Sequence, residues 1–171
     1  MNNTITIDGV TIELTKEQVE KLKVELGIKK KSPFERVEDG KPYFSIDWNG
    51  HTYLHSEETS RFDAERFNVA NYCTDRDLMT KRTKEEALNR LLWRFSMEND
   101  GDKIDWGDDL IDKYAVYYDC HSNCYKVASY TILNIISTPY FYTYTIAQRA
   151  IDEIVIPFNE GKLPCCKIWE E

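Results

Sequence analysis

Tyr114-Ala115-Val116-Tyr117-Tyr118 and Tyr125-Lys126-Val127-Ala128-Ser129-Tyr130 are two runs of aromatic and β-branched residues that follow each other closely. Runs of this composition are typical of β-strands. Two further runs cover residues 132–136 and 140–144. The pattern predicts a three- or four-stranded antiparallel β-meander in the last third of the chain.

Two amphipathic helices are predicted beside this meander. Thr145 and Gln148 have the spacing of a capping box, as do Thr83 and Glu86, whose helix should run to about Met97. Apolar residues follow each box at helical spacing. They are Ala87, Leu88, Leu91, Leu92 and Phe95 in the first helix, and Ala147, Ala150, Ile151, Ile154, Val155 and Phe158 in the second.

Two β-hairpins are predicted in the first third of the chain. Residues 4–14 alternate around Asp8-Gly9, and residues 43–54 flank Asn49-Gly50. Between residues 56 and 82 the chain is polar, and we expect irregular structure with a helical turn after Thr74.

The first hairpin leads into a short predicted helix. Thr15 and Gln18 form its capping box, and its apolar stripe is followed by Gly27; the stripe is Val19, Leu22 and Leu26. We expect residues 1–28 to form a compact ββα unit that docks on the main body or on a second copy, and residues 34–171 to form the main domain. The fold class is therefore α+β, with antiparallel hairpins and a C-terminal β-meander packed against amphipathic helices.

Acidic residues exceed basic residues by 30 to 22, which gives a net charge of −8. This charge disfavours direct binding to nucleic acid and to anionic membranes, and favours a basic partner surface. The first residues lack the pattern of a signal peptide and no apolar run is long enough to span a membrane, so we expect neither export by that route nor a membrane span. The five cysteines fit a reducing compartment. We expect a cytoplasmic protein.

Three groups of residues could form a metal-binding or catalytic site, but each lacks some of the ligands, partners or spacing that such a site requires. Cys120, His121 and Cys124 supply at most three zinc ligands, and Cys165-Cys166 could join them only through the fold. The thiol of Cys73 would need a base such as His51 or His55. The carboxylates of Asp100, Asp102 and Asp105 fail the spacing of a calcium-binding EF-hand loop. We expect no catalytic residue, metal or cofactor.

Two positive features remain for partner binding. Seven acidic residues and one lysine lie between Glu98 and Asp112, and eight of the eleven tyrosines lie between Tyr114 and Tyr144. Strand alternation would place the tyrosines of residues 140–144 on one face, either as a recognition surface or under a helix. The candidate partner-binding residues are Asp102, Asp105, Trp106, Asp108, Asp109, Tyr117, Tyr140, Tyr142 and Tyr144.

Over residues 34–158 the chain resembles small accessory proteins encoded by phages and prophages of Firmicutes. The resemblance lies in Asn68-Val69-Ala70-Asn71-Tyr72-Cys73, in Asn89-Arg90-Leu91-Leu92-Trp93-Arg94-Phe95 with Asn99-Asp100-Gly101-Asp102, and in Tyr140-Phe141 with Ala147, Ala150 and Ile151. It implies a phage setting, in which small acidic proteins often inhibit host defence.

Three functions are compatible with these observations. The first is a non-enzymatic inhibitor that binds a host nuclease or CRISPR-type defence protein stoichiometrically, through acidic and aromatic surfaces. The second is a homo-oligomeric sponge that stacks a nucleotide signal on the tyrosine face. The third is a hydrolase with a site that no motif marks.

Overall fold

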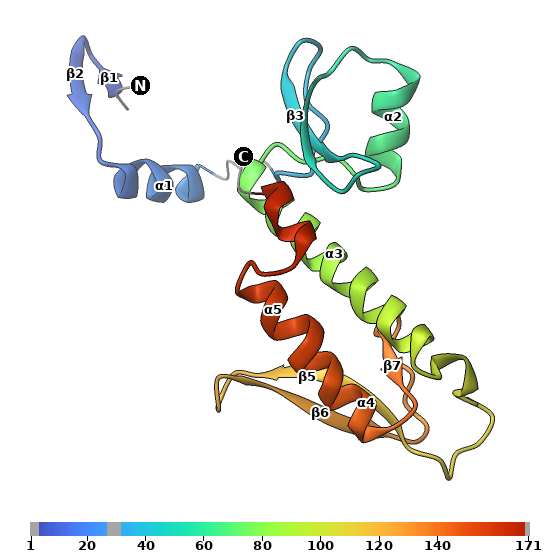
Figure 1. Cartoon of the computed structure of the whole chain (residues 1–171). Helices are drawn as coiled ribbons and strands as arrows, with labels where there is room; N and C mark the ends of the chain where they lie inside the picture. Colours follow the sequence, from blue (N-terminus) through green and yellow to red (C-terminus); the bar gives the residue numbers. More distant parts are fainter. Residues whose placement is uncertain (1–3, 27–31, 170–171) are drawn as a thin grey trace.

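A single long helix connects the two halves of the molecule in a computed structural model that describes residues 4–26 and 32–169 (Figure 1). This helix, α3 (Arg76–Glu98), contacts a β-hairpin near its N-terminal end, and contacts the C-terminal helices and a short strand further along. We call these two halves the hairpin lobe (residues 33–74) and the sheet lobe (residues 99–163).

The hairpin lobe consists of β3 (Pro42–Ile46), β4 (Thr52–Ser56) and α2 (Arg61–Asn68). The backbone of Cys73 exchanges two hydrogen bonds with that of Phe44, which adds a third short strand segment to β3. Inside the lobe the ring of Tyr43 stacks on Tyr72, with ring centroids 3.9 Å apart. The second predicted hairpin is therefore confirmed.

The β3–β4 turn differs from the two-residue turn that Asn-Gly commonly forms. The amide of Asp47 donates to the carbonyl of His51, and the amide of Gly50 donates to the carbonyl of Asp47. Three residues, Trp48 to Gly50, thus form the loop, and only Gly50 has a positive φ, 85°. This is the geometry of a three-residue hairpin loop with glycine in the left-handed position.

The sheet lobe contains β5 (Lys113–Asp119), β6 (Cys124–Tyr130) and β7 (Tyr140–Phe141), all antiparallel. The strand order is β6-β5-β7, so the chain crosses over between β6 and β7. The α+β class is confirmed, but the predicted meander is wrong in its order, and residues 132–136 form no strand. Tyr140 pairs with Ala115 and Phe141 with Tyr114 of β5, and both side chains are buried.

The C-terminal helical segment runs through α4 (Tyr144–Ala150), the π-helix η2 (Ile151–Val155) and α5 (Ile156–Asn159). Its cap is Thr143, whose hydroxyl accepts from the Ile146 amide, so the predicted Thr145 cap is wrong by two positions. The π-turn, in which Ile156 N–H donates to Ile151 O, directly precedes Pro157. Proline has no amide hydrogen, so this altered register accommodates it within the helix.

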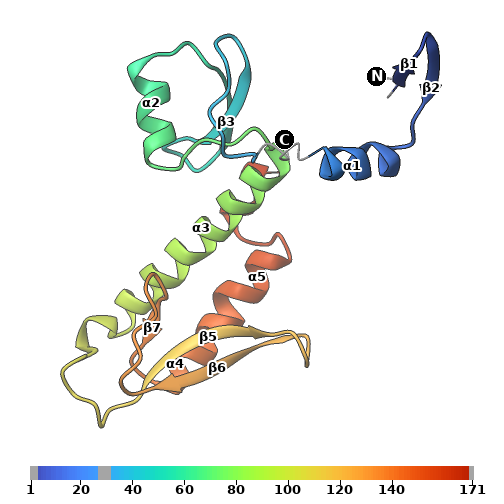
Figure 2. The same ribbon diagram turned by 180° about the vertical axis from the view of Figure 1, so that it is seen from behind.

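The apolar core of the sheet lobe lies between α3, β5–β7 and α4, as Figure 2 shows from behind. Its buried residues are Phe95, Phe141, Ala147 and Ala150. Beyond α5 the chain forms the 3-10 helix η3 (Pro164–Trp169), and after α3 it forms η1 (Gly101–Lys103). Gly101 packs so tightly on α3 that a Cβ there would lie 2.7 Å from the carbonyl oxygen of Ser96.

The N-terminal segment contains β1 (Thr4–Ile7), β2 (Val10–Glu13) and α1 (Lys16–Glu25). Asp8 and Gly9 both have positive φ, as a two-residue hairpin turn requires, and the Thr15–Gln18 capping box is present. The predicted Gly27 helix end lies outside the described residues. In Figures 1 and 2 the hairpin continues from one end of α1 and does not lie along it. The division into residues 1–28 and 34–171, and docking of the first part on the main body or on a second copy, stay predictions. A two-stranded hairpin and a ten-residue helix bury too little apolar area to hold each other.

The predicted start of α3 at Thr83 is wrong. The helix begins seven residues before Thr83, with Asp75 as its cap. Thr83 is buried inside the helix, and its hydroxyl donates to the carbonyl of Met79. The region predicted to be irregular holds α2, whose capping box of Ser60 and Asp63 the sequence analysis missed.

Removing the Asp75 cap should destabilise the protein. The Asp75 carboxylate accepts a hydrogen bond from the Leu78 amide at 3.0 Å. We expect Asp75→Ala to lower the free energy of unfolding by about 1 kcal/mol in urea denaturation. The matched control is Asp77→Ala, which removes a charge in the same turn without a capping bond and should cost less. Equal stability of Asp75→Ala and wild type would mean that α3 does not start there.

Candidate functional site

Two loops leave the same end of the sheet and are fastened together by Lys113. Lys113 begins β5 opposite Tyr130 at the end of β6. Its ammonium group, buried with the residue 1% exposed, donates to the carbonyls of Asp108 and Thr131 and lies 5.7 Å from the Trp106 ring centre. Because an unpaired buried charge is costly, these contacts fix the loops before β5 and after β6 against each other.

Tyr140 is a second anchor for these loops. Its hydroxyl donates to the carbonyl of Leu133 and accepts from the amide of Ile135, and its ring meets Trp106 edge to face at 4.8 Å. The side chain is only 6% exposed, so its predicted role as a partner contact is corrected to a structural one.

The outer side of the two loops combines exposed apolar side chains with carboxylates. Leu110 and Ile136 are 89% and 91% exposed. The carboxylates of Asp105 and Asp108 accept bonds from the amides of Gly107 and Leu110, which shapes the first loop. We call this area the loop surface and define it by Asp102, Asp105, Trp106, Asp108, Asp109, Leu110, Ile111, Ile132, Leu133, Ile135 and Ile136.

The remaining predicted tyrosines do not gather on one face. β7 ends at Phe141, so Tyr142 lies in the following turn and Tyr144 in the first turn of α4. Tyr144 meets Tyr114 edge to face, and Tyr117 is exposed on β5 opposite Lys126. The predicted tyrosine face of residues 140–144 is therefore wrong, because the strand on which it depended is only two residues long.

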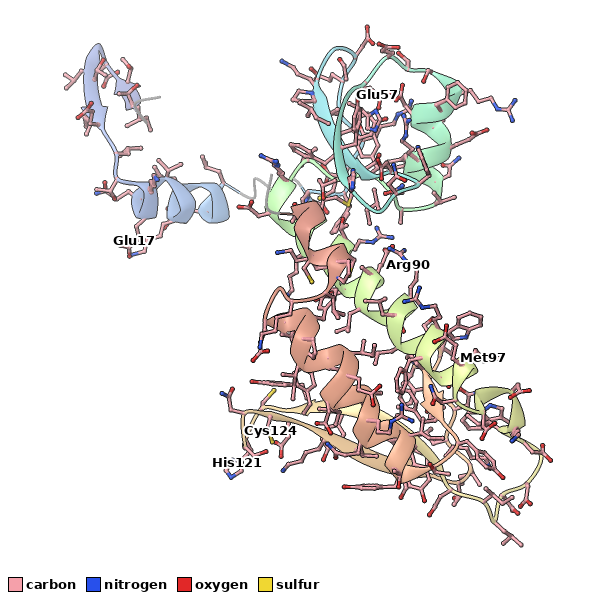
Figure 3. All side chains as sticks on the ribbon, in the orientation of Figure 1. Glu17, Glu57, Arg90, Met97, His121 and Cys124 are labelled. Carbon is pink, nitrogen blue, oxygen red and sulfur yellow. The ribbon has the colours of Figure 1, made fainter. Side chains whose placement is uncertain are left out.

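Two hollows that the sequence analysis missed lie along α3. The first has a volume of about 520 Å³ and the second about 370 Å³, and both are lined by Arg90 and Trp93. The β3–β4 turn borders the first hollow, and the loop at Ser137 borders the second. Figure 3 shows Arg90 projecting from the middle of α3. In the sequence, the hollows could have been suspected only from Arg90, Trp93 and Arg94, which lie on one side of the predicted helix.

The hairpin lobe encloses a network of charged and phenolic groups. Glu57 is 1% exposed and accepts two hydrogen bonds from Arg36 and one, 2.8 Å long, from the Tyr72 hydroxyl. Asp63, also buried, accepts a 2.5 Å bond from the Tyr43 hydroxyl. Every one of these groups therefore has a partner inside the lobe.

The same contacts shift the protonation equilibria of the network. Hydrogen bonds from Arg36 chiefly lower the pKa of Glu57. Burial alone would raise the pKa of Asp63, but hydrogen bonds from Ser60 and Tyr43 and from backbone amides outweigh it and lower the pKa. Burial raises the pKa of Tyr43 to about 12 and that of Tyr72 to about 12. The carboxylates thus stay charged and the phenols neutral at neutral pH, and in this state their hydrogen bonds stabilise the lobe.

Cys73 and His55, which the sequence analysis considered as a nucleophile and its base, have other partners in the structure. The Ser45 hydroxyl lies 2.8 Å from His55 Nε2, but Ser45 is buried and the imidazole stacks on Tyr43. Burial and Arg66 lower the pKa of His55. The sulfur of Cys73, also buried, accepts a bond from the Asp75 amide.

The candidate metal ligands of the sequence do not combine into a metal-binding group in the described part of the chain. Cys120, His121 and Cys124 lie at the exposed tip of the β5–β6 hairpin, where Figure 3 shows the last two, and Asp119 accepts bonds from His121, Ser122 and Lys126 there. Within residues 4–26 and 32–169, no three histidine, cysteine or acidic side chains are grouped to hold a metal ion. Burial and the neighbouring Cys166 raise the pKa of the Cys165 thiol.

Comparison of the chain with protein-family models, with curated proteins and with solved structures gives no match. No helix in the described part of the chain is long and apolar enough to cross a membrane. The candidate surfaces must therefore be interpreted from their own geometry and charge.

Stability of the hairpin lobe should depend on pH in the acid range. Because Glu57 and Asp63 have lowered pKa values in the folded protein, their stabilisation is complete above the ordinary carboxyl values of about 4. It is lost as the pH falls through and below that range. Urea unfolding of wild type and Glu57→Gln between neutral pH and about pH 3 measures this, with the variant less stable by about 2 kcal/mol at neutral pH. A difference that stays constant down to the lowest pH would contradict the assignment.

Removing the Lys113 ammonium group should loosen the loop surface. We expect Lys113→Met, which keeps most of the side-chain length, to free residues 105–112 and 131–136 while the sheet remains folded. Amide hydrogen exchange in both segments should become at least about tenfold faster, which corresponds to a loss of about 1.4 kcal/mol in local stability. Lys126→Met, which removes an exposed ion pair at the other end of the sheet, is the control. Unchanged exchange in both segments would show that Lys113 does not fasten them.

Proposed function

We propose that this protein is a non-enzymatic accessory protein of phage or prophage origin that inhibits a host defence protein, a nuclease or CRISPR-type component, by stoichiometric binding. The single observation that carries this proposal is the loop surface. There, Leu110 and Ile136 are almost fully exposed on loops that Lys113 and Tyr140 hold in place. Exposed apolar surface marks interaction sites where it is contiguous, and a loop that is held in place loses little entropy on binding.

The charges around this apolar centre indicate the kind of partner. Asp102, Asp105 and Asp109 are exposed beside it, and the whole chain has a net charge of −8. A partner with an apolar patch ringed by lysine and arginine would complement it, since opposite potentials speed association and select the partner. A nucleic-acid-binding groove on a defence nuclease has this chemistry.

The two other functions receive less support. A sponge that stacks bases on a tyrosine face would need exposed rings, whereas Tyr140 is buried and Tyr142 and Tyr144 have left the strand. A hydrolase would need perturbed groups in a cleft. The groups with shifted pKa values in the Tyr43, Glu57, Asp63 and Tyr72 network do not line the hollows along α3. Cys165 does line the first hollow, but burial raises the pKa of its thiol, which disfavours the reactive thiolate.

Substitutions on the loop surface should abolish partner capture. We expect Ile132→Ser combined with Ile136→Ser to reduce capture of one host protein from a lysate at least tenfold, because each buried isoleucine contributes roughly 1.5–3 kcal/mol. Immobilised protein and quantitative mass spectrometry provide the measurement. With the partner purified, Asp102→Asn and Asp109→Asn should slow association, and added salt should slow it further.

The matched control is Trp48→Ser, which removes a 92% exposed aromatic side chain from the hairpin lobe. This variant should capture the partner as well as the wild type does. Equal capture by the isoleucine variant would remove the loop surface from the proposal, and an association rate independent of salt would remove its carboxylates.

A further inference from the structure

The first hollow along α3 has walls of different chemical character. Ala87 and Leu91 form an apolar floor, and Arg90 and Arg94 flank them. Asn49 and Gly50 close one side from the β3–β4 turn, and Cys165 contributes from η3. A volume of about 520 Å³ lies within the range of small-molecule sites.

The two arginines are available to a ligand. Arg90 lies 3.8 Å from Glu86, but that carboxylate has a closer partner in Arg82 at 2.7 Å. Arg94 lies 3.9 Å from Glu98, beyond hydrogen-bond distance. One turn apart on the helix, the two guanidinium groups can reach one anion, and their planar forks suit phosphate.

Arg90 also lies close to the hairpin lobe. A Cβ on Gly50 would lie 3.3 Å from Arg90 Nη2, so the guanidinium group rests against the β3–β4 turn. Gly50 is itself buried and has a positive φ. The turn therefore limits the space that is open to the Arg90 side chain on that side.

Trp93 adds an aromatic surface between the two hollows. Its side chain is 61% exposed, although a ring of this size is normally drawn into a core. It lines the first hollow, and it lines the second together with Asn89, Ser137 and Pro139. The Asn89 side chain donates to the carbonyl of Ser137, which fixes the wall of the second hollow.

We propose that the two hollows form a nucleotide-binding site, with a phosphate between Arg90 and Arg94 and a base stacked on Trp93. An exposed indole beside paired arginines is the combination that binds base and phosphate together. Because the second hollow offers room on its own side of Trp93, a dinucleotide binds more tightly than a mononucleotide. This binding activity goes beyond the proposed protein inhibition and uses different residues.

Calorimetry with the purified full chain tests the site. The probes are a linear adenine dinucleotide, AMP, adenosine, inorganic phosphate and a single-stranded oligoadenylate. We expect the dinucleotide to bind best, AMP more weakly, and adenosine and phosphate weakest. Arg90→Gln, Arg94→Gln and Trp93→Ala should each weaken dinucleotide binding about tenfold or more. The control is Lys81→Gln, which removes one charge from α3 outside both hollows and should leave binding unchanged.

Each other outcome overturns the proposal. These outcomes are no heat with the dinucleotide, phosphate binding as tight as dinucleotide binding, wild-type affinity in the Arg90 and Trp93 variants, and oligoadenylate affinity that rises with length. The last would indicate a single-stranded nucleic-acid groove instead. Because the variants change exposed side chains, circular dichroism should show an unaltered fold, and the test does not involve the partner of the loop surface.

Discussion

The unbroken course of α3 through Thr83 is the constraint on which the rest of the structure depends. A helix of 23 residues is about 35 Å long. At one end the Thr83 hydroxyl, besides donating to Met79, lies 3.2 Å from Thr52 on β4. At the other end Phe95 enters the core of the sheet lobe. Because α3 is one continuous helix, its middle part around Arg90 lies against both the β3–β4 turn and the loop at Ser137.

The sequence patterns that predicted the fold correctly describe structure that depends on only a few neighbouring residues. Asp8-Gly9 forms its turn because both residues adopt positive φ. The apolar stripe from Ala147 to Phe158 predicted the buried face of the last helix, because a 3.6-residue period must face a core. The prediction that Thr83 caps the helix was wrong. A threonine hydroxyl inside a helix can donate to a carbonyl of the preceding turn, and the sequence alone does not distinguish this position from a cap.

The surfaces could be predicted only in part. Composition identified the acidic run around Asp105, which does lie on the exterior. It did not show that Lys113, a residue expected on the surface, is buried beneath that run and organises it. Tyr140 was predicted as a partner contact because tyrosine is common at interfaces. It is buried because its strand pairs with Ala115 of β5 after the chain has crossed over from β6, and that pairing depends on residues far apart in the sequence. The hollows were missed for the same reason, since their walls come from four separate segments.

The net charge of −8 describes the whole chain but not the environment that a ligand meets. At physiological ionic strength charges are screened over about 8 Å, so the arginines at the middle of α3 and the carboxylates of the loop surface act separately. The two surfaces share the 131–139 loop, whose Ser137 borders the second hollow and whose Ile132 and Ile136 are exposed. A ligand in that hollow would therefore touch a loop that also contributes to the loop surface. Any coupling between the two sites through this loop would be reciprocal, so that each ligand would change the affinity for the other by the same factor.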